Sequence, residues 1–331
     1  MSAPRIAIIG SGSWATALAK LFLNNTKLLN WYVRKEEDAA YFNEFKTNPR
    51  YLSSVEFDTD KIKFYTSLSE CIQNSDYLVL AIPSAFLNDS FASISDKDLQ
   101  HKILFSAIKG IVPQHNLIVG EYLNKAYNVP LQNIGVISGP CHAEEVAMEK
   151  LSYLTIASIN TANAQTLSNL LNCRYLKSTV SDDIYGTEFS AVLKNVIAVA
   201  GGICHGLGYG DNFLAVLVSN AIQEIKRFVD AVHPIDRDIK ASAYLGDLLV
   251  TAYSQFSRNR MFGTMLGKGY SVKQAQLEMN MVAEGYYAVK CVYEINKVHK
   301  VNMPITNAVY NIIYQNHDVR KEIINLSNLL S

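Results

Sequence analysis

The sequence is poor in cysteine, and its few cysteines do not form the pattern of a disulfide framework. They are scattered and odd in number, and no C-x-x-C pair occurs. Secreted small domains depend on dense, paired cysteines, whereas thiols in a reducing compartment stay free. We therefore expect reduced thiols and a cytoplasmic protein. The five are Cys71, Cys141, Cys173, Cys204 and Cys291.

Long apolar runs are also missing. A membrane-spanning helix needs about 20 mostly apolar residues. The segment that comes nearest, 189–204, is interrupted by Lys194 and Asn195. The first apolar run, 6–9, is too short for a signal peptide and leads into a glycine turn. The sequence thus predicts neither a membrane span nor a secretion signal.

Neither an excess of one charge nor a metal-ligand pattern is present. The 30 Lys and Arg residues balance 30 Asp and Glu residues, and neither half has a strong basic block. We therefore expect no nucleic-acid partner. The seven histidines include no pair at the H-x-x-x-H spacing of a metal site. We expect no metal, and interpret His142 and His205 as incidental.

What the sequence does contain is apolar residues in short, regular runs. It is 49% hydrophobic and 18% charged over 331 residues, which suits two globular domains with a large core. Up to about residue 180, β-rich runs alternate with helix-like runs, which is typical of a mostly parallel sheet with helices on both faces. We predict an α/β, Rossmann-like doubly wound domain over residues 1–180. Its expected strands are 5–9, 29–33, 62–65, 77–81, 103–106, 134–137, 153–157 and 174–178.

Beyond residue 180 strand signals nearly vanish and helical patterns dominate. The sequence therefore predicts an all-α domain over residues 181–331. Its expected helices are 183–204, 212–230, 240–254, 258–267, 271–278, 284–298, 304–314 and 318–329.

The segment Gly10-Ser-Gly-Ser-Trp-Ala15 follows the first expected strand and precedes a helix-like run over 16–23. Gly10 permits a tight turn, Gly12 lets the backbone approach a pyrophosphate, and Ala15 lets the helix pack closely. The helix N-terminus adds free N–H groups and a positive dipole end. This context predicts dinucleotide binding, the alternative being an ordinary βα turn with chance glycines.

In a dinucleotide-binding site, residues at the end of the second strand contact the ribose and distinguish NAD from NADP. An acid there bonds the 2′-OH of NAD, whereas an arginine accepts the 2′-phosphate of NADP. Here the first polar residue is Arg34, which favours NADP(H). The alternative is a solvated Arg34, with Glu36 or Glu37 holding the ribose.

Lys194 is the most unusual residue of the second half, since it lies in the apolar run FSAVLKNVIAVAGGI. A buried lysine should have a lowered pKa and a partner, and enzymes use such lysines as acids or bases. The alternative is a lysine that reaches from a half-buried helix to water. Asp247, at the head of another apolar run, is either its carboxylate partner or a plain N-cap.

Three further segments carry polar groups at expected element ends. Ser257-Arg258-Asn259-Arg260 opens the helix 258–267, so it is either an anion site or a basic solvated turn. Lys109 comes just past the fifth strand, at the sheet edge where ligands bind in doubly wound folds. The segment Ser138–Ala143 is another turn after a strand.

Together these segments resemble the bacterial NAD(P)-dependent glycerol-3-phosphate dehydrogenase family. The motifs run in the family's order and span nearly the whole chain. They are GSGSWATAL at 10–18, KGI at 109–111, SGP at 138–140, LKN at 193–195, GLGYGDN at 206–212, GDLL at 246–249, SRNR at 257–260, FG at 262–263, LGKG at 266–269 and EG at 284–285.

The resemblance implies reversible reduction of dihydroxyacetone phosphate to sn-glycerol 3-phosphate by NADPH or NADH, which supplies glycerophospholipid synthesis. It also implies a Rossmann domain, a helical C-terminal domain and a homodimer. By resemblance Lys194 is the catalytic lysine and Asp247 belongs to the substrate cradle. We expect Asp247 also to act in catalysis, as the carboxylate that faces Lys194.

The resemblance assigns further residues to cofactor and substrate. The cofactor positions are Gly10, Gly12, Ser13, Trp14, Arg34, Lys109, Ala143, Arg258, Val282 and Glu284. The substrate positions are Lys109, Gly139, Cys141, Lys194, Asp247, Ser257, Arg258 and Asn259. The chain departs from the family pattern at Cys141, where serine or threonine is more common, at His205, which replaces a common aspartate, and before Lys194, where a glycine pair is missing.

Two other functions compete with this interpretation. One is a β-hydroxyacid dehydrogenase of the same two-domain build, although the anion site at 257–260 favours a phosphate over a lone carboxylate. The other is a non-catalytic NAD(P) sensor, which would have no reason to keep Lys194 in an apolar helix.

Overall fold

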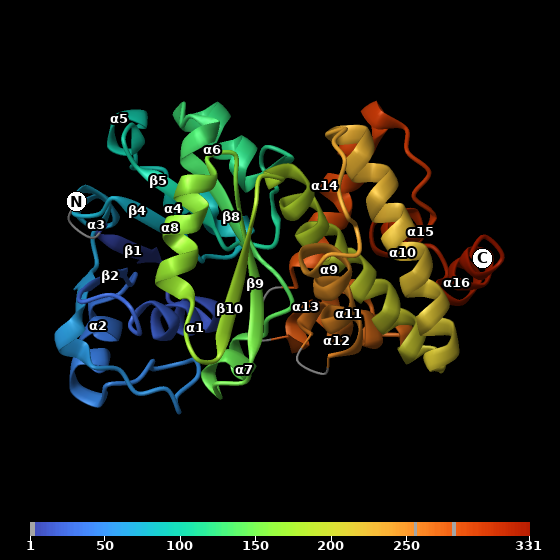
Figure 1. The fold of residues 1–331 in the computed structure, drawn as a ribbon. Coiled ribbons are helices and arrows are strands. Elements are labelled where there is room, and N and C mark those ends of the chain that lie inside the picture. The colour runs from blue at the N-terminus through green and yellow to red at the C-terminus, as the bar shows by residue number, and fades with distance from the viewer. Residues whose placement is uncertain (1–3, 255–256, 280–282) are drawn as a thin grey trace. The chain divides into compact units, whose positions relative to one another are not determined.

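The computed structural model describes residues 4–254, 257–279 and 283–331, and the chain packs as two compact units. Unit 1 comprises Met1–Ile108 and Val119–Ile184, and unit 2 comprises Lys109–Ile118 and Tyr185–Ser331 (Figure 1). The sequence places the boundary near residue 180, whereas the contacts divide the chain after Ile184. They also assign Lys109–Ile118 to the helical unit, which the sequence does not anticipate.

Unit 1 is built on an eight-stranded sheet in the order β10-β9-β8-β5-β4-β1-β2-β3. Neighbouring strands run parallel, except that β8 and β9 are antiparallel. The expected Rossmann-like sheet is confirmed. Its strands are β1 Ile6–Ile9, β2 Leu29–Tyr32, β3 Ile62–Tyr65, β4 Tyr77–Leu80, β5 Ile103–Ser106, β8 Ile134–Ser138, β9 Ser152–Ser158 and β10 Leu176–Ser181.

The helices of unit 1 form two groups. In one, α1 packs with α7 and α8, and in the other α5 packs with α3 and α6. Right-handed crossovers place these groups on opposite faces of the sheet. The helices are α1 Ser13–Phe22, α2 Glu36–Phe45, α3 Leu68–Gln73, α4 Leu87–Ser90, α5 Asp96–Leu99, α6 Val119–Tyr127, α7 Ala143–Ala147 and α8 Thr161–Leu171. Short 3₁₀ turns cover Thr59–Lys61, Ser84–Phe86 and Leu131–Asn133.

The order of strands places the glycine turn at a point where ligands bind. β1 lies between β2 and β4, and the chain returns from β3 at one edge to β4 on the other side of β1. Such a reversal leaves a crevice beyond the carboxyl ends of the central strands. Both β1 and β4 are buried along their whole length, as expected of central parallel strands.

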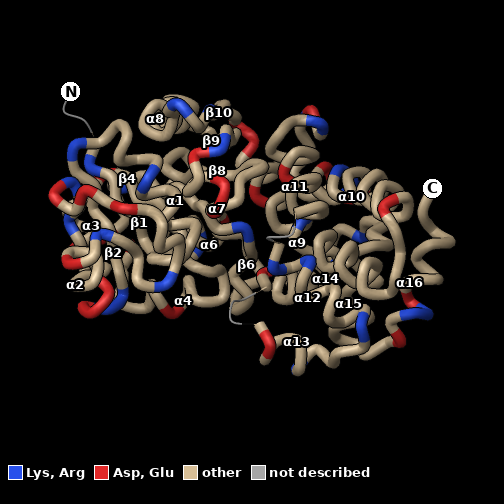
Figure 2. The backbone as a smooth tube through the Cα atoms, turned by 90° about the horizontal axis from the view of Figure 1, so that it is seen from below, with Lys and Arg blue, Asp and Glu red and all other residues tan. Residues whose placement is uncertain are grey.

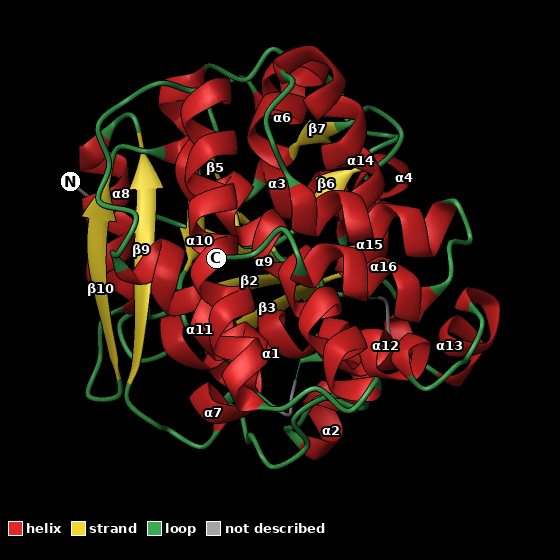
Figure 3. Ribbon diagram, turned by 90° about the vertical axis from the view of Figure 1, so that its right-hand side faces the viewer, coloured by secondary structure: helices red, strands yellow, loops and turns green. Residues whose placement is uncertain are grey.

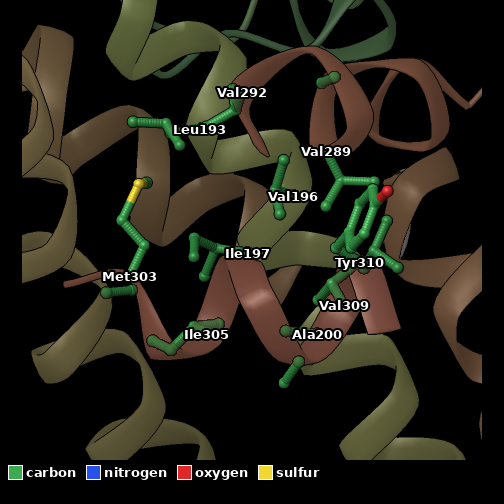
Figure 4. Packing of buried hydrophobic residues seen from close by; sticks show 14 of the residues in the cluster. Leu193, Val196, Ile197, Ala200, Val289, Val292, Met303, Ile305, Val309 and Tyr310 are labelled. Carbon is green, nitrogen blue, oxygen red and sulfur yellow. The ribbon is translucent and has the colours of Figure 1, made fainter. Parts of the chain in front are cut away.

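Unit 2 is helical, as expected, and packs around α9 Ile184–Gly206. Its side chains lie against those of α14 Glu284–His299 and α15 Pro304–Tyr314, as Figure 4 shows for Leu193, Val196, Ile197, Val289 and Val309. The other helices are α10 Asp211–Val232, α11 Asp247–Tyr253, α12 Arg258–Gly267, α13 Val272–Glu278 and α16 Val319–Ser327.

The length and composition of α9 would also suit a membrane span, and it is the one such helix among the described residues. However, 89% of its most apolar window is buried inside the structure. This burial is typical of the core helix of a folded domain. Charged residues of both signs are interspersed along each unit (Figure 2).

A small hairpin in unit 2 is absent from the sequence-based expectation. Strands β6 Ile111–Val112 and β7 Leu117–Ile118 pair in antiparallel fashion, and β6 contacts α14 (Figure 3). Ile111 and Ile118 are fully buried in the core of unit 2. Strands of two residues are too short to leave a periodic pattern, which is why the sequence gives no signal for them.

Several element boundaries differ from expectation by a few residues, and two of these differences matter for the site. The helix expected over 240–254 is a π-helical turn, Ser242–Gly246, followed by α11. Helix α1 begins at Ser13 rather than at Thr16, directly after the glycine turn. Both differences lie next to residues with expected roles, Asp247 and the segment Gly10–Trp14.

Candidate functional site

The glycine turn after β1 has the geometry of a dinucleotide-binding turn. Gly10 has φ +123°, and a Cβ there would lie 2.5 Å from the carbonyl oxygen of Ala81. Apart from Gly12 itself and the chain next to it, no described atom lies within 4 Å of the position that a Cβ on Gly12 would take. Gly10 is therefore required by the turn itself, whereas Gly12 leaves open space in which a ligand can approach the backbone.

The start of α1 is suited to an anion. Its first intrahelical bond joins Thr16 N–H to Gly12 O at 3.0 Å, so the N–H groups of Ser13, Trp14 and Ala15 have no acceptor within the helix. No acidic residue lies in the first turn. The Nε1 atom of Trp14 is buried and has no hydrogen-bond partner among the described residues. These donors fit the phosphates of a dinucleotide.

Arg34 is exposed directly beyond the second strand, where the sequence expects a 2′-phosphate contact. The competing acids have another explanation, since Glu36 and Glu37 lie in the first turn of α2, where negative charge is favourable. The Glu37 carboxylate also lies 3.9 Å from Lys35 Nζ. Arg34 is therefore a better candidate than Glu36 or Glu37 for contacting the ribose of the cofactor.

In unit 2 a buried carboxylate joins two lysines. Lys194 Nζ lies 2.5 Å from Asp247 Oδ1, and Lys109 Nζ lies 2.9 Å from Asp247 Oδ2. The side chains of Lys194 and Asp247 are 7% and 1% exposed. The suggestion that Lys194 reaches out to water is therefore wrong. Asp247 is likewise no simple N-cap, because its carboxylate binds both lysines.

Burial and charge act in opposite directions on these groups. Burial lowers the pKa of Lys194, and the attraction of Asp247 only partly restores it. Burial alone would raise the pKa of Asp247, but the charges of Lys109 and Lys194 outweigh this effect and hold it below its usual value. With both lysines protonated and the aspartate ionised, the three charges sum to +1.

Three segments deliver these residues. Lys194 comes from α9, Asp247 is the first residue of α11, and Lys109 precedes the β6–β7 hairpin. Asn195 donates its amide to Lys109 O at 2.6 Å and so ties the hairpin segment to α9. Thr251, one turn after Asp247, accepts from Lys194 Nζ at 2.8 Å.

Sequence reasoning missed the roles of Thr251 and Asn195. The Thr251 hydroxyl also donates to Asp247 O at 2.7 Å, which fixes the hydroxyl as an acceptor toward Lys194. The signal for Thr251 was its position four residues after Asp247, which places both on one face of a helix. No comparable pattern links Asn195 to Lys109, because they are 86 residues apart.

The beginning of α12 has the expected features of an anion site. The Ser257 hydroxyl caps the helix by accepting from Arg260 N–H at 3.2 Å, and no acid lies in its first turn. Arg258 is exposed and makes no ion pair with the described residues. Asn259 is buried, and its Oδ1 accepts from Gly285 N–H at 2.9 Å. Asn259 thus supports the start of α14, and its Nδ2 has no hydrogen-bond partner among the described residues.

Helix α12 lies unusually close to α9. A Cβ on Gly263 would meet Val199 O at 2.1 Å, and a Cβ on Gly202 would meet Arg260 O at 2.1 Å. One turn further along, Gly206 and Gly267 face each other's backbone in the same way. These glycines fix the helix that begins at Arg258 against the helix that carries Lys194.

The remaining expected residues lie in both units. Gly139, with φ +136°, follows β8 in unit 1, and the Cys141 thiol donates to Tyr153 O at 3.1 Å, so this sulfur stabilises the turn. Ala143 is the first residue of α7, and Glu284 the first of α14. Val282 is outside the described residues. In the described parts of the chain, no group of three or more His, Cys, Asp or Glu side chains could hold a metal.

Comparison with known proteins gives a consistent family. The family described as NAD-dependent glycerol-3-phosphate dehydrogenase N-terminus matches residues 5–164, and the corresponding C-terminus matches residues 183–324. A glycerol-3-phosphate dehydrogenase [NAD(P)+] of Chlorobium limicola is 33% identical over 322 residues, which is 97% of this chain and 96% of the relative. That of Clostridium botulinum is 34% identical over 314 residues, 95% of this chain and 94% of the relative.

Solved structures agree. The crystal structure of glycerol-3-phosphate dehydrogenase from Coxiella burnetii has a TM-score of 0.89 and 27% identity, covering 98% of both chains. The enzyme from Saccharomyces cerevisiae has a TM-score of 0.83 and 24% identity, covering 98% of this chain and 99% of that one, and so shows the shared fold.

Proposed function

The chain belongs to the NAD-dependent glycerol-3-phosphate dehydrogenase family, and on this premise we propose how its residues reduce dihydroxyacetone phosphate to sn-glycerol 3-phosphate. The chain is an oxidoreductase that uses NAD(H) or NADP(H), and its product is a precursor of glycerophospholipids. The observation that carries the mechanism is the buried cluster of Lys194, Asp247 and Lys109.

Unit 1 supplies the cofactor site. The open space at Gly12 and the free N–H groups of Ser13 and Trp14 fit a pyrophosphate. Arg34, which is exposed beyond β2, is the proposed partner of a 2′-phosphate. Bound there, the reduced nicotinamide supplies the hydride. The family pattern adds a set of further cofactor contacts: Lys109, Ala143, Arg258, Val282 and Glu284.

Lys194 is the general acid. A carbonyl that accepts a hydride becomes an alkoxide and needs a proton. The Lys194 ammonium donates it, and burial favours the neutral amine that remains. Asp247 holds the ammonium at 2.5 Å, and Thr251 fixes its direction. In the reverse reaction the neutral amine accepts the proton of the alcohol.

The charge of the site suits a phosphorylated substrate. The cluster has a net charge of +1 when both lysines are protonated, and Arg258 adds a guanidinium in unit 2 that pairs with no described acid. The first-turn N–H groups of α12, the Ser257 hydroxyl and the Asn259 amide are donors for the phosphate. Binding the phosphate holds the distant carbonyl in place for reaction. Gly139 and Cys141 are further substrate contacts by family pattern.

The proposed assembly is a homodimer in the cytoplasm. The reduced-thiol composition supports the compartment, and the burial of α9 supports a soluble chain without a membrane span. Light scattering after size exclusion should give twice the mass of the 36.8 kDa chain. A mass of one chain at micromolar concentration would contradict the dimer.

The experiment that tests the function follows absorbance at 340 nm while both reduced cofactors are crossed with several ketones. We expect turnover with dihydroxyacetone phosphate and a kcat/KM about 100-fold lower with dihydroxyacetone, because charge-assisted bonds to the phosphate are lost. Arg258→Ala should reduce this preference and leave the melting temperature unchanged. Equal use of both ketones would contradict the phosphate site, and preferential use of 2-ketoacids would favour a β-hydroxyacid dehydrogenase.

A further inference from the structure

Asn48 connects a distant segment to the glycine turn. The residue is 2% exposed, and its Nδ2 donates to Ser11 O at 3.0 Å and to Thr16 Oγ1 at 2.8 Å. The Thr16 hydroxyl in turn donates to Gly12 O at 2.9 Å. One buried amide therefore holds two consecutive carbonyl groups of the turn, the second through a threonine.

The preceding carbonyl is held from another strand. Trp31, on β2, donates its Nε1 to Gly10 O at 2.7 Å. The indole is fully buried and packs against Phe42 and Phe57 at ring-centre distances of 4.9 and 5.4 Å. Three successive carbonyls of the turn are thus bonded to side chains of unit 1.

This arrangement determines where the N–H groups of the turn point. In a trans peptide the N–H and the C=O point in opposite directions. Holding the carbonyls of Gly10, Ser11 and Gly12 therefore fixes the directions of the N–H groups of Ser11, Gly12 and Ser13, each of which points away from the carbonyl of its own peptide. Oriented N–H groups of successive residues form an anion-binding concavity.

The segment that carries Asn48 is itself fixed, so the amide has little freedom to move. Its Oδ1 accepts from Arg50 N–H at 2.9 Å and from Tyr51 N–H at 3.1 Å. The Arg50 guanidinium pairs with both carboxylate oxygens of Asp38 on α2. The Oδ1 atom of Asn48 is therefore bound to its own segment, and the Nδ2 atom is bound to the glycine turn and to Thr16.

We propose that Asn48 is a positioning residue for the cofactor, which fixes the peptides of the glycine turn so that their N–H groups face the pyrophosphate. The proposal rests on the proposed function in one respect, namely that this turn binds a dinucleotide. The pyrophosphate is common to both cofactors, so the effect of Asn48 is the same for NADH and NADPH.

The test measures the Kd of NADH and NADPH by fluorescence titration, together with the melting temperature. Asn48→Ala should raise both dissociation constants by the same factor, about tenfold, as expected for one lost hydrogen-bond tie. With cofactor saturating, kcat should stay within about twofold. Thr16→Val, which removes the bridging hydroxyl without adding charge, should act in the same direction, and Thr16→Ser should restore binding.

Asn30 provides a matched control. It is also a buried asparagine of unit 1, and its Nδ2 also donates to one carbonyl, Asn74 O at 3.0 Å, and one hydroxyl, Ser75 Oγ at 2.8 Å. These partners lie at the amino end of the sheet, away from the glycine turn. Asn30→Ala should lower the melting temperature and leave both dissociation constants at the wild-type value.

Two results would overturn the proposal. One is an Asn48→Ala variant with a lower melting temperature and unchanged dissociation constants, since Asn48 would then resemble Asn30. The other is an effect on NADPH alone, which would assign Asn48 to the ribose and not to the pyrophosphate. If the wild-type chain bound neither cofactor, the proposed function would fail instead, and the two failures are thus distinguishable.

Discussion

At the scale of single residues, the site depends on one carboxylate that is shared by two lysines. Breaking a lone buried ion pair leaves an uncompensated charge and strongly destabilises a protein. Here Asp247 keeps one cation if the other is removed. Losing Lys194 therefore takes the cluster from a net charge of +1 to neutral, with Lys109 balancing Asp247.

Lys194→Ala should for this reason lower kcat by about 100-fold or more, the usual scale for a lost general acid, while the fold survives. Steady-state kinetics and circular dichroism check the two parts. Thr251→Val is the control, because it removes the neutral partner of Lys194 and keeps all charges, and it should cost much less activity. Turnover near the wild-type rate in Lys194→Ala would remove Lys194 from the reaction.

The lowered pKa of Lys194 predicts the pH dependence of both directions. Reduction needs the ammonium, so kcat/KM for dihydroxyacetone phosphate should fall as pH rises through the pKa of Lys194. Oxidation of glycerol 3-phosphate needs the amine, so its rate should rise over the same range. This range should lie below 10.5, the ordinary value for lysine. Rates measured in both directions from pH 5 to 10 check this pH dependence. If the same change of rate with pH persisted in Lys194→Ala, it would arise from another titrating group.

Arg34 should distinguish the cofactors. Arg34→Ala should raise KM for NADPH at least tenfold and leave KM for NADH nearly unchanged, because only NADPH has the 2′-phosphate. Initial rates with each cofactor measure this split. Equal weakening of both would restrict Arg34 to the shared part of the cofactor and make Lys35 the next candidate.

The chemically unusual residues were the ones that could be identified from the sequence. Lys194 and Asp247 stand out because charges are rare in apolar runs, and the structure brings them together. Asn48 is an ordinary polar residue whose role arises only from tertiary contacts, and Thr251 is marked only by its spacing of four residues from Asp247. The pairing of Lys109 with Asp247 spans 138 residues, and no local pattern predicts a bond of that range.

At the scale of elements, the close approach of α9 to α12 fixes the position of the proposed anion site. Gly263→Ala should push the helices apart, because its Cβ would lie 2.1 Å from Val199 O. We expect a loss of about 1–3 kcal/mol in unfolding free energy, typical of overpacking, and a severalfold higher KM for dihydroxyacetone phosphate. Urea unfolding and steady-state kinetics measure both.

Gly201→Ala, on α9, is the control for that substitution. Its Cβ would meet only the flexible end of Leu214, at 3.2 Å. Alanine is also the better helix former, so stability and KM should change little. If both substitutions had equal effects, the close contact between helices would not explain the result.

Elements with a strong period were predictable, and short or irregular ones were not. Helix α12 has the predicted bounds, 258–267, because a capping serine precedes an uninterrupted helical run. The hairpin β6–β7 could not be predicted, because its two-residue strands are too short to show an alternating pattern in the sequence. For the π-helical turn before Asp247 the sequence predicts regular helix, because a wider turn changes the backbone and not the type of residue.

At the scale of the whole molecule, unit 2 is not a continuous piece of chain. A fragment of residues 181–331 would lack Ile111 and Ile118, and burial of each contributes about 1.5–3 kcal/mol. The free energy of unfolding of a domain is about 5–15 kcal/mol, so losing both side chains removes a large part of it. We therefore expect this fragment to show no cooperative thermal transition. Calorimetry and circular dichroism measure this.

The matched fragment carries residues 109–118 joined to it by a flexible linker. It should regain a cooperative transition, because the hairpin restores the missing core residues and the Asn195 bond to Lys109. A fragment that melted equally well without the hairpin would show that the helices alone are sufficient.

The hairpin also has a consequence for how this gene can recombine. A crossover anywhere between codons 119 and 184 would take Lys109 from one parent and Lys194 with Asp247 from the other. The three side chains make up one charge cluster. A substitution at Lys109 in one parent must therefore be compatible with Lys194 and Asp247 from the other. A recombinant protein would keep the proposed proton donor only if both parents had the same arrangement of Lys109, Lys194 and Asp247. We therefore expect the two parts of the gene to evolve together.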